Sequence, residues 1–299
     1  QLFEKMGVSV DNVQIQLKNA IDNLPAVTGS GRKADEVYVS QDVDRALREA
    51  EKEAARMKDD FVSVEHLVLG LFDAMGKELQ LLQHIISNKK ECKCSGLQIY
   101  SGEIGNHEVY AMQCGIGKIN AAIGTWLLTG NYAPDLIITT GVAGGADISV
   151  KQADIVVGEQ IAYHDVWCGP GTIYGQASEM PLYFKSSKEI IKIAKSLAEQ
   201  FPIKFGLICS GDKFISTQEE IDEIKNKFPQ AMAVDMESAA IAHVCHIKQI
   251  PIFAIRIISD TPGGDVDNTS QYENFWDAAP LHTFQVLCNI LQQINEPII

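Results

Sequence analysis

Arginine is scarce over most of this chain of 299 residues. Arg256 is the only arginine after residue 56. The formal net charge of -14 argues against nonspecific binding to nucleic acid or to an anionic membrane. No uncharged apolar run approaches twenty residues, so we expect no membrane-spanning helix. The other four arginines all lie near the start of the chain: Arg32, Arg45, Arg48 and Arg56.

Motifs for bound nucleotide phosphates and for metals are also missing. The pattern G-x-x-x-x-G-K-[ST] occurs nowhere, which excludes a P-loop site within these residues. Cys92 and Cys94 stand too close together for a zinc knuckle, and His243 and His246 lack a third ligand. The seven cysteines are an odd number without a small-scaffold pattern, and no secretory signal is visible after Gln1. We therefore expect reduced thiols, a cytoplasmic location, no metal and no cofactor.

The chain divides into a short helical part and a longer α/β part. Its length suits one or two domains. The early arginines contrast with cysteines that all follow residue 90, which suggests two pieces of different origin. Apolar residues at helical spacing cover 10–24 and 40–58. We place a helical fragment at 1–66 and an α/β domain at 67–299.

Three apolar runs organise the longer part. They lie at 205–209, 231–234 and 251–258, and helical patterns separate them. A β-α-β-α-β order predicts parallel strands joined by helical crossovers. Further patterns predict strands at 67–72, 135–140 and 154–163, a hairpin of 97–104 with 107–114 about Gly105-Asn106, and helices at 75–86, 118–128, 187–200 and 271–292.

Polar residues follow each of the three apolar runs. The segments are Ser210-Gly211-Asp212, Asp235-Met236-Glu237 and Ser259-Asp260. Open α/β sheets bind ligands at the carboxyl ends of their strands, so we expect a site there.

The motifs SGDKFI, VDMESAAIAHVC and IRIISD, in this order and spacing, resemble the nucleoside phosphorylase/nucleosidase superfamily. The likeness is greatest to the branch that hydrolyses 5'-methylthioadenosine and S-adenosylhomocysteine, and it covers about 69–299. It implies a three-layer α/β/α sandwich with a mixed central sheet, here preceded by a small all-α segment. It also implies a homodimer that hydrolyses the N-glycosidic bond of a 5'-substituted adenosine to adenine and the thioribose.

Three carboxylates are candidates for the chemistry. Asp260 ends a very apolar strand, where burial favours the proton-donating form needed at purine N7; an Asx turn or helix cap is the alternative. Glu237 has two acceptor oxygens that suit the ribose diol; a favourable first-turn helix charge is the alternative. The resemblance implies that Glu78 activates water, although Gly76-Lys77 replaces the family's usual acidic run and a surface glutamate is the alternative.

The resemblance also assigns contacts with the base and the sugar. Phe214 is expected to stack on the purine, and Ile215 to offer backbone atoms to the base edge. Met236 is expected to pack on the sugar. The glycine-rich stretch 141–145, which includes Ala143 and Gly144, is expected to be a loop under the ribose.

Other expected contacts lie around the water and the 5'-substituent. Arg256 is expected to steady Glu78 and the attacking water. Ser259 is also expected to touch the substrate. The residues expected around the 5'-substituent are Ile116, Met75 and Tyr272. The GIGK stretch at 115–118 is a weak phosphate signal, and we favour tight strand-to-helix packing there.

Phosphorolysis is the main alternative to hydrolysis. A phosphorylase must bind a phosphate dianion, for which the family uses several arginines, whereas only Arg256 is present in this domain. Val142 also stands where a phosphate site would need a hydroxyl group. We therefore favour hydrolysis.

Residues 2–72 resemble part of the amino-terminal domain of Clp-type AAA+ chaperones. The likeness rests on NAIDNLPAVTGSG and on VSQDVDRALREAEKEAARMKDDFVSVEHLVLGLF. A peptide-binding adaptor is the functional interpretation, and we favour an inactive fusion remnant because half a domain buries little surface. Residues 67–72 fit either a helix or a strand, and we favour a strand.

Overall fold

The computed structural model of the chain describes residues 86–263, 275 and 280–294, with the side chains of the last helix described from residue 285. The helices expected in 1–66, the strand expected at 67–72 and most of the helix expected at 75–86 lie outside these residues. So do three candidate site residues: Met75, Glu78 and Tyr272.

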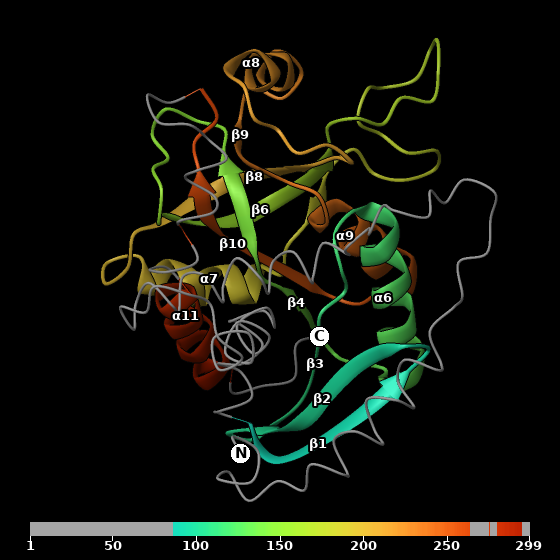
Figure 1. Ribbon diagram of the computed structural model, residues 1–299, viewed down its shortest axis with the longest axis vertical. Helices are drawn as coiled ribbons and strands as arrows, with labels where there is room; N and C mark the ends of the chain where they lie inside the picture. Colours follow the sequence, from blue (N-terminus) through green and yellow to red (C-terminus); the bar gives the residue numbers. More distant parts are fainter. Residues whose placement is uncertain (1–85, 264–274, 276–279, 295–299) are drawn as a thin grey trace, which may run out of the picture. The chain divides into compact units, whose positions relative to one another are not determined.

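A mixed sheet forms the centre of the described fold (Figure 1). Its strand order is β4-β10-β5-β9-β8-β6-β7, and β10 also pairs with β6, so the middle strands close on themselves. The strands are β4 (Ile137–Thr139), β5 (Val142–Gly145), β6 (Ile155–Tyr163), β7 (Phe184–Lys185), β8 (Ile203–Ser210), β9 (Ala231–Asp235) and β10 (Ile252–Asp260).

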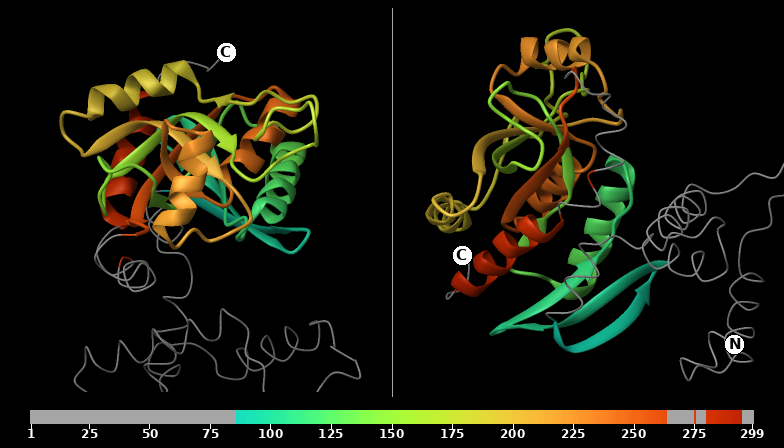
Figure 2. Two further views of the ribbon diagram at one scale, coloured as in Figure 1. Left: turned by 90° about the horizontal axis from the view of Figure 1, so that it is seen from above. Right: turned by 60° about the vertical axis from the view of Figure 1, so that its left-hand side comes forward.

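Helices cover both faces of this sheet (Figures 1 and 2). On one face, α6 (Lys118–Tyr132) packs beside α9 (Ser238–Lys248). On the other, α7 (Lys188–Leu197) packs beside α11 (Pro280–Gln293). Helix α8 (Gln218–Lys227) connects β8 to β9. The expected three-layer arrangement with a mixed sheet is therefore confirmed.

Strand β10 is the most deeply buried element among the described residues. All nine of its residues are buried, because β4, β5 and β6 pair with it and helices cover both faces. A strand that is covered on both faces reads as a continuous apolar run rather than an alternating one, which is why 251–258 was recognised from the sequence.

A second sheet joins β1 (Ser87–Cys94), β2 (Leu97–Ile104) and β3 (His107–Met112) in antiparallel order. The expected hairpin of β2 and β3 is confirmed, with a turn at 105–106. Strand β1 was not expected, since its sequence SNKKECKC has no apolar alternation. It is an exposed edge strand, where lysines are common.

Two expectations about the central sheet are wrong. Strands β8 and β9 are parallel as expected, but β10 runs antiparallel to them, because it pairs antiparallel with β6 and β6 pairs parallel with β8. Residues 142–145 form strand β5 rather than a loop, and β5 lies between β9 and β10. A glycine-rich stretch carries no apolar alternation, so nothing local marked it as a strand.

Candidate active site

The ends of four strands line up across the sheet. Ser210 of β8 is in register with Asp235 of β9, and Gly144 of β5 is in register both with Val234 of β9 and with Asp260 of β10. Neighbouring strands lie about 4.8 Å apart, so one intervening strand separates the end of β10 from β9 by about 10 Å. Strand β5 thus brings Asp260 and the polar residues after β9 to the same region.

Asp260 lies at an irregularity of strand β10. The register with β5 shifts between Ile258 and Asp260, which makes Ser259 the extra residue of a bulge. Bulges beside active sites re-aim side chains. Asp260 is 2% exposed, and its Oδ1 accepts a hydrogen bond of 2.5 Å from Ser259 Oγ. Ser259 Oγ also lies 3.3 Å from the carbonyl oxygen of Ala143.

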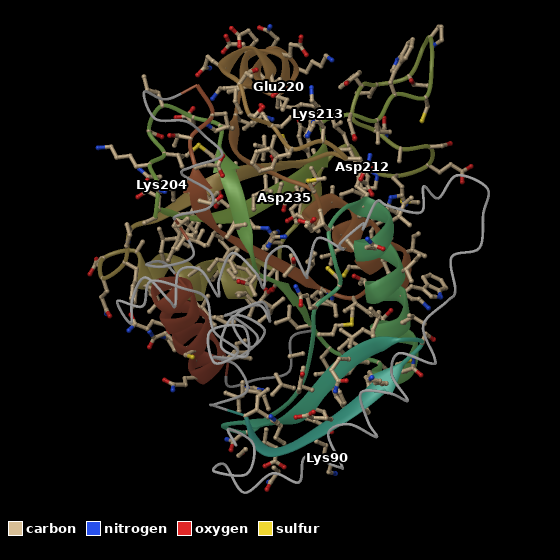
Figure 3. The ribbon with its side chains drawn as sticks, in the orientation of Figure 1. Lys90, Lys204, Asp212, Lys213, Glu220 and Asp235 are labelled. Carbon is tan, nitrogen blue, oxygen red and sulfur yellow. The ribbon has the colours of Figure 1, made fainter. Side chains whose placement is uncertain are left out.

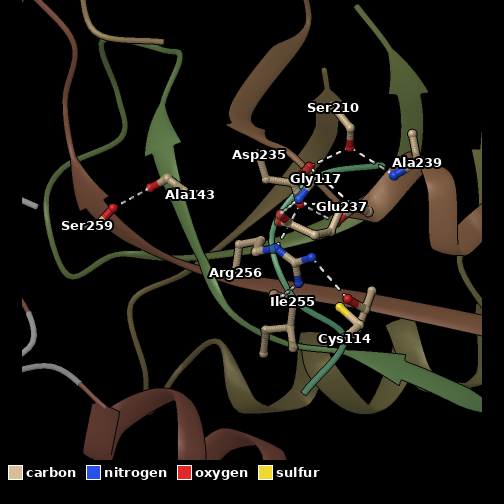
Figure 4. Close-up of polar contacts among 12 residues, drawn as sticks. Cys114, Gly117, Ala143, Ser210, Asp235, Glu237, Ala239, Ile255, Arg256 and Ser259 are labelled. Atoms are coloured by element: carbon tan, nitrogen blue, oxygen red, sulfur yellow. Dashed lines mark hydrogen bonds and ion pairs between the residues drawn. The ribbon is translucent and has the colours of Figure 1, made fainter. Parts of the chain in front are cut away.

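Arg256 and Asp235 form a fully buried ion pair (Figure 4). Arg256 Nε donates to Asp235 Oδ2 at 2.8 Å. The two remaining guanidinium nitrogens donate to the Ile255 carbonyl at 2.9 Å and to Thr139 Oγ1 at 3.0 Å. The expected contact of Arg256 with Glu78 lies outside the described residues.

The same carboxylate organises the start of helix α9. Asp235 accepts hydrogen bonds from the hydroxyl groups of Ser210 and Ser238. Ser210 Oγ in turn accepts the amide N–H of Ala239 at 2.8 Å. The amides of Ser238 and Ala239, which lack partners within the helix, are satisfied in this way, so the role of Asp235 is structural.

Glu237 is the N-cap residue of α9 and faces the start of α6. Its Oε1 accepts the amide N–H of Gly117 at 2.9 Å (Figure 4). Burial first, and the nearby Asp235 carboxylate second, raise the pKa of Glu237 above its ordinary value. Gly115 and Gly117 have φ values of 85° and 92°, in the region that favours glycine, so the GIGK stretch turns sharply enough to aim this donor.

The loop 211–217 after β8 carries Phe214 and Ile215. Ile215 is buried, whereas Phe214 is 44% exposed. The far end of the loop is held by Glu220, whose Oε2 accepts the amide N–H groups of Ser216 at 2.8 Å and Thr217 at 3.1 Å. Lys213, next to Asp212 in the chain, forms an ion pair with Glu220, and all three residues are labelled in Figure 3.

The remaining sequence-predicted residues lie at the ends of neighbouring elements. Met236 is half-buried between β9 and α9. Ala143 is buried and Gly144 is half-buried in β5. Ile116 precedes α6 and is 59% exposed. The described residues therefore bring these four to the strand and helix ends that also carry Glu237 and Asp260.

Sequence reasoning missed a cluster beside this site. Lys118 contacts the carboxylates of Asp165, which follows β6, and Asp212, which follows β8. Two signals were present: Lys118 ends the GIGK stretch, and both aspartates follow an apolar strand. Neither signal indicates that the three side chains meet.

The described residues hold no metal-binding cluster, and His243 packs against the core. Across 86–263, 275 and 280–294, no group of three or more His, Cys, Asp and Glu side chains is arranged to hold a metal ion. His243 Nδ1 lies 3.1 Å from Tyr163 Oη, and its ring stacks on Phe184. None of the helices in the same residues is long and apolar enough to cross a membrane.

Comparison with known proteins gives two family matches. Residues 68–292 match the phosphorylase superfamily. Residues 1–85 match the Clp repeat (R) N-terminal domain. The two matches share 68–85, which includes most of 67–72, the segment whose sequence fits either a helix or a strand.

Individual relatives agree with the first match. The 5'-methylthioadenosine/S-adenosylhomocysteine nucleosidase of Tolumonas auensis is 35% identical over 230 residues, which is 76% of this chain and 99% of the relative. Its counterpart from Staphylococcus aureus strain MRSA252 is 36% identical over 76% of this chain and 100% of the relative.

Solved structures agree as well. An S-adenosylhomocysteine nucleosidase from Streptococcus pyogenes, in complex with 5-methylthiotubericidin, superposes on this chain with a TM-score of 0.71 and is 32% identical to it. The match covers 74% of this chain and 94% of the S. pyogenes chain. Futalosine hydrolase of Helicobacter pylori shares the fold, with a TM-score of 0.69 at 24% identity over 74% of this chain and 95% of its own. The chain therefore belongs to the phosphorylase superfamily and, within it, to the 5'-methylthioadenosine/S-adenosylhomocysteine nucleosidases.

Proposed function

We infer that this protein hydrolyses the N-glycosidic bond of 5'-methylthioadenosine and S-adenosylhomocysteine, and releases adenine and the thioribose. Membership of the family and the strand-end carboxylates support this inference. In the reaction the bond from C1' to purine N9 breaks, and the water oxygen bonds to C1'. A proton added at N7 lets adenine leave as a neutral base, and the water gives up a proton.

Asp260 is the proposed proton donor. Its carboxyl group is almost fully buried at the end of an apolar strand, where desolvation favours the protonated form. The bulge at Ser259 and the short bond from its hydroxyl group hold one carboxyl oxygen in place. A positioned acid of this kind contributes ~10²–10⁴-fold to a proton-transfer step.

Glu237 is the proposed partner of the ribose hydroxyl groups. One oxygen accepts the Gly117 amide, which orients the carboxylate and leaves acceptor capacity on both oxygens for a vicinal diol. Met236, Ala143 and Gly144 are proposed to surround the sugar. We propose Glu78 as the base that accepts the proton of the water.

The other proposed contacts lie at the base and at the 5'-substituent. Phe214 and Ile215 are proposed to bind the purine. Ser259 is proposed to contact the substrate beside Asp260. Ile116, Met75 and Tyr272 are proposed to line the 5'-pocket.

The state of Arg256 is the single observation that carries hydrolysis over phosphorolysis. It is the only arginine after residue 56, and it is 2% exposed and paired with Asp235. A phosphate dianion needs free cationic donors, for which arginine is the usual residue. Lys118 and Lys213, which lie near the site, are paired with Asp165 and Glu220. Water is therefore the proposed nucleophile.

Incubation with 5'-methylthioadenosine or S-adenosylhomocysteine, with and without about 0.1 M phosphate, tests this function. We expect adenine and free methylthioribose at the same rate in both cases. Methylthioribose 1-phosphate as the product, at a rate that rises with phosphate, would contradict the proposal. Failure to release adenine from 5'-methylthioadenosine and from S-adenosylhomocysteine would contradict it as well.

We also propose a homodimer, built on an apolar stripe of helix α6. Ile119, Ile123 and Trp126 lie on one side of this helix and are 72%, 54% and 49% exposed. Ile116 continues the stripe toward the proposed 5'-pocket. Large apolar side chains that recur at helical spacing and face water mark an interaction surface. A second copy seated on this stripe would lie beside the pocket.

Ile123→Glu tests the dimer. A charge in the centre of an apolar interface is costly, so we expect the variant to sediment as a monomer and to lose most of its activity. A fully active wild-type protein that is monomeric at micromolar concentration would contradict the dimer.

We further propose a cytoplasmic location, which the odd number of cysteines supports.

A further inference from the structure

Three charged side chains outside the proposed chemistry meet at the start of helix α6. The Lys118 ammonium lies 2.8 Å from both carboxylate oxygens of Asp165 and 3.3 Å from Asp212 Oδ2. The Lys118 amide N–H donates to Asp212 Oδ1, and the Asp212 amide N–H donates to Asp165 Oδ2, both at 2.9 Å. We call these three residues the lysine–aspartate cluster. It joins the start of α6 to the segments that follow β6 and β8.

Consecutive amide groups connect this cluster to Glu237. The N–H of Gly117 donates to Glu237 Oε1, and the next N–H, that of Lys118, donates to Asp212 Oδ1. A β-carbon at Gly117 would lie 3.6 Å from Asp212 Oδ1, so the two segments are in close contact. The two amide groups are joined by one planar peptide unit, so a displacement of Lys118 also displaces the Gly117 amide that donates to Glu237.

The loop 211–217 is held at two places. Asp212 fixes its start through the cluster, and Glu220 fixes its end through the amides of Ser216 and Thr217. Phe214 lies between these two anchors and is partly exposed. The anchor at Asp212 also contacts the ribose side of the site. It accepts a hydrogen bond from Lys118, and the preceding residue, Gly117, donates to Glu237.

We propose that Lys118 and Asp165 are positioning residues, which set the separation between the purine-binding loop 211–217 and the ribose-binding carboxylate of Glu237. This inference rests on the proposed function. Neither side chain needs to touch the substrate. Without the cluster, both binding elements persist but lose the mutual placement that one rigid nucleoside requires, and small displacements of this kind are costly in catalysis.

If Lys118 and Asp165 formed only an ordinary surface ion pair, the effect of removing them would be different. Lys118 and Asp165 are 19% and 30% exposed, and pairs of this kind contribute little to folding stability. Removing one should then change neither stability nor kinetics. The control is the ion pair of Lys195 on α7 with Glu159 on β6, at 2.7 Å, which is more exposed and has neither residue in the proposed site.

Kinetics of Lys118→Met, Asp165→Asn and Lys195→Met provide the first test. We expect the first two variants to lower kcat/KM for 5'-methylthioadenosine by roughly 10- to 100-fold with a raised KM. Their unfolding temperatures should stay close to that of the wild type. The loss in the double variant should be smaller than the sum of the two single losses, because both variants remove the contact of Lys118 with Asp165. Lys118→Arg should recover part of the loss, and Lys195→Met should behave as the wild type.

Hydrogen exchange of the unliganded protein provides a second test that does not need turnover. In Lys118→Met, the amides of 212–217 should exchange faster than in the wild type, and adenine should bind more weakly by calorimetry. If the wild type releases no adenine from 5'-methylthioadenosine, the proposed function fails, and exchange and adenine binding alone decide the role of the cluster. Unchanged kcat/KM in Lys118→Met with an active wild type, or unchanged exchange in 212–217, overturns the proposal.

Discussion

Asp260 is buried and Glu237 is half-buried, and the two carboxyl groups have different neighbours. Asp260 accepts from a hydroxyl group within a tightly packed strand, whereas Glu237 accepts from a backbone amide at the start of a helix. Glycoside hydrolysis commonly divides its work between two carboxyl groups whose surroundings set their protonation. The proposed roles of proton donor and diol acceptor follow this division.

Replacing Asp260 tests the proton donor. Asp260→Asn keeps the shape of the side chain and its bond from Ser259, but it cannot deliver a proton to N7. We expect kcat to fall ~10²–10⁴-fold while a non-hydrolysable nucleoside analogue binds nearly as well as to the wild type. Near-normal turnover in this variant would mean that the acid lies elsewhere.

Replacing Glu237 tests the diol contact and its electrostatic cost. Hydrogen bonds to a charged acceptor contribute ~1.5–3 kcal/mol each. Glu237→Gln removes the charge and weakens the hydrogen bonds from both ribose hydroxyl groups, so we expect kcat/KM to fall by roughly 10²-fold or more. A 2',3'-dideoxy substrate should be nearly insensitive to the change. Equal losses for both substrates would argue against the contact.

The same variant should alter the pH dependence of stability. A raised carboxyl pKa means that the folded state favours the protonated form. The wild type then loses stability as the pH rises through this raised pKa, and Glu237→Gln does not. We expect the variant to unfold at a higher temperature than the wild type at pH ~8, with the difference vanishing below pH ~4, near the ordinary pKa of glutamate. A difference that is constant with pH would contradict the sign.

At the scale of secondary-structure elements, the contacts of one ion pair connect four strands and a helix. Arg256 of β10 and Asp235 of β9 pair across the inside of the closed sheet, and their partners include Thr139 of β4 and Ser210 of β8. The same carboxylate contacts the start of α9, which presents Glu237. The buried pair therefore holds the site together without providing its chemistry.

Breaking this pair should be much more harmful than breaking a partly exposed one. Asp235→Asn leaves the Arg256 charge buried and unbalanced, so we expect the free energy of unfolding to fall by ~3–5 kcal/mol. The control is Asp147→Asn, which removes the contact with Lys225 at 2.5 Å, about a quarter exposed, and should cost at most ~1 kcal/mol. Urea denaturation of both variants measures the difference, and equal losses would contradict this ranking.

At the scale of the whole molecule, the chain joins a Clp-like segment to a nucleosidase domain. We propose the boundary at residue 67, between a helical fragment at 1–66 and the nucleosidase domain at 67–299. The family matches overlap at 68–85, immediately after this boundary. The stretch matters because it contains the proposed first strand of the domain together with Met75 and Glu78.

Two truncations test the boundary. A protein of residues 63–299 should retain nucleosidase activity, whereas one of 80–299 should lose it. The longer deletion removes the proposed strand at 67–72 and the proposed base Glu78, and the buried side chains of one strand are a large part of a total stability of ~5–15 kcal/mol. A folded but inactive 63–299 protein would mean that the Clp-like segment contributes to function.

Local sequence pattern was sufficient for most of the elements and for the acidic residues at their ends. Apolar runs marked β6, β8, β9 and β10, and the turn at Gly105 marked the hairpin of β2 and β3. Motif order was sufficient for the family and the class of reaction. These features are readable because burial on one or both faces imposes a periodicity that nearby residues report.

Long-range pairing lay beyond the sequence. Nothing in the glycine-rich stretch at 142–145 indicates that it forms a strand between β9 and β10, or that β10 runs antiparallel to β8 and β9. The meeting of Lys118 with Asp165 and Asp212 is equally invisible, since up to 94 residues separate the partners. Strand register and ion pairing depend on which distant segments the closed sheet brings together. The hydrophobic periodicity of each segment does not identify its partner.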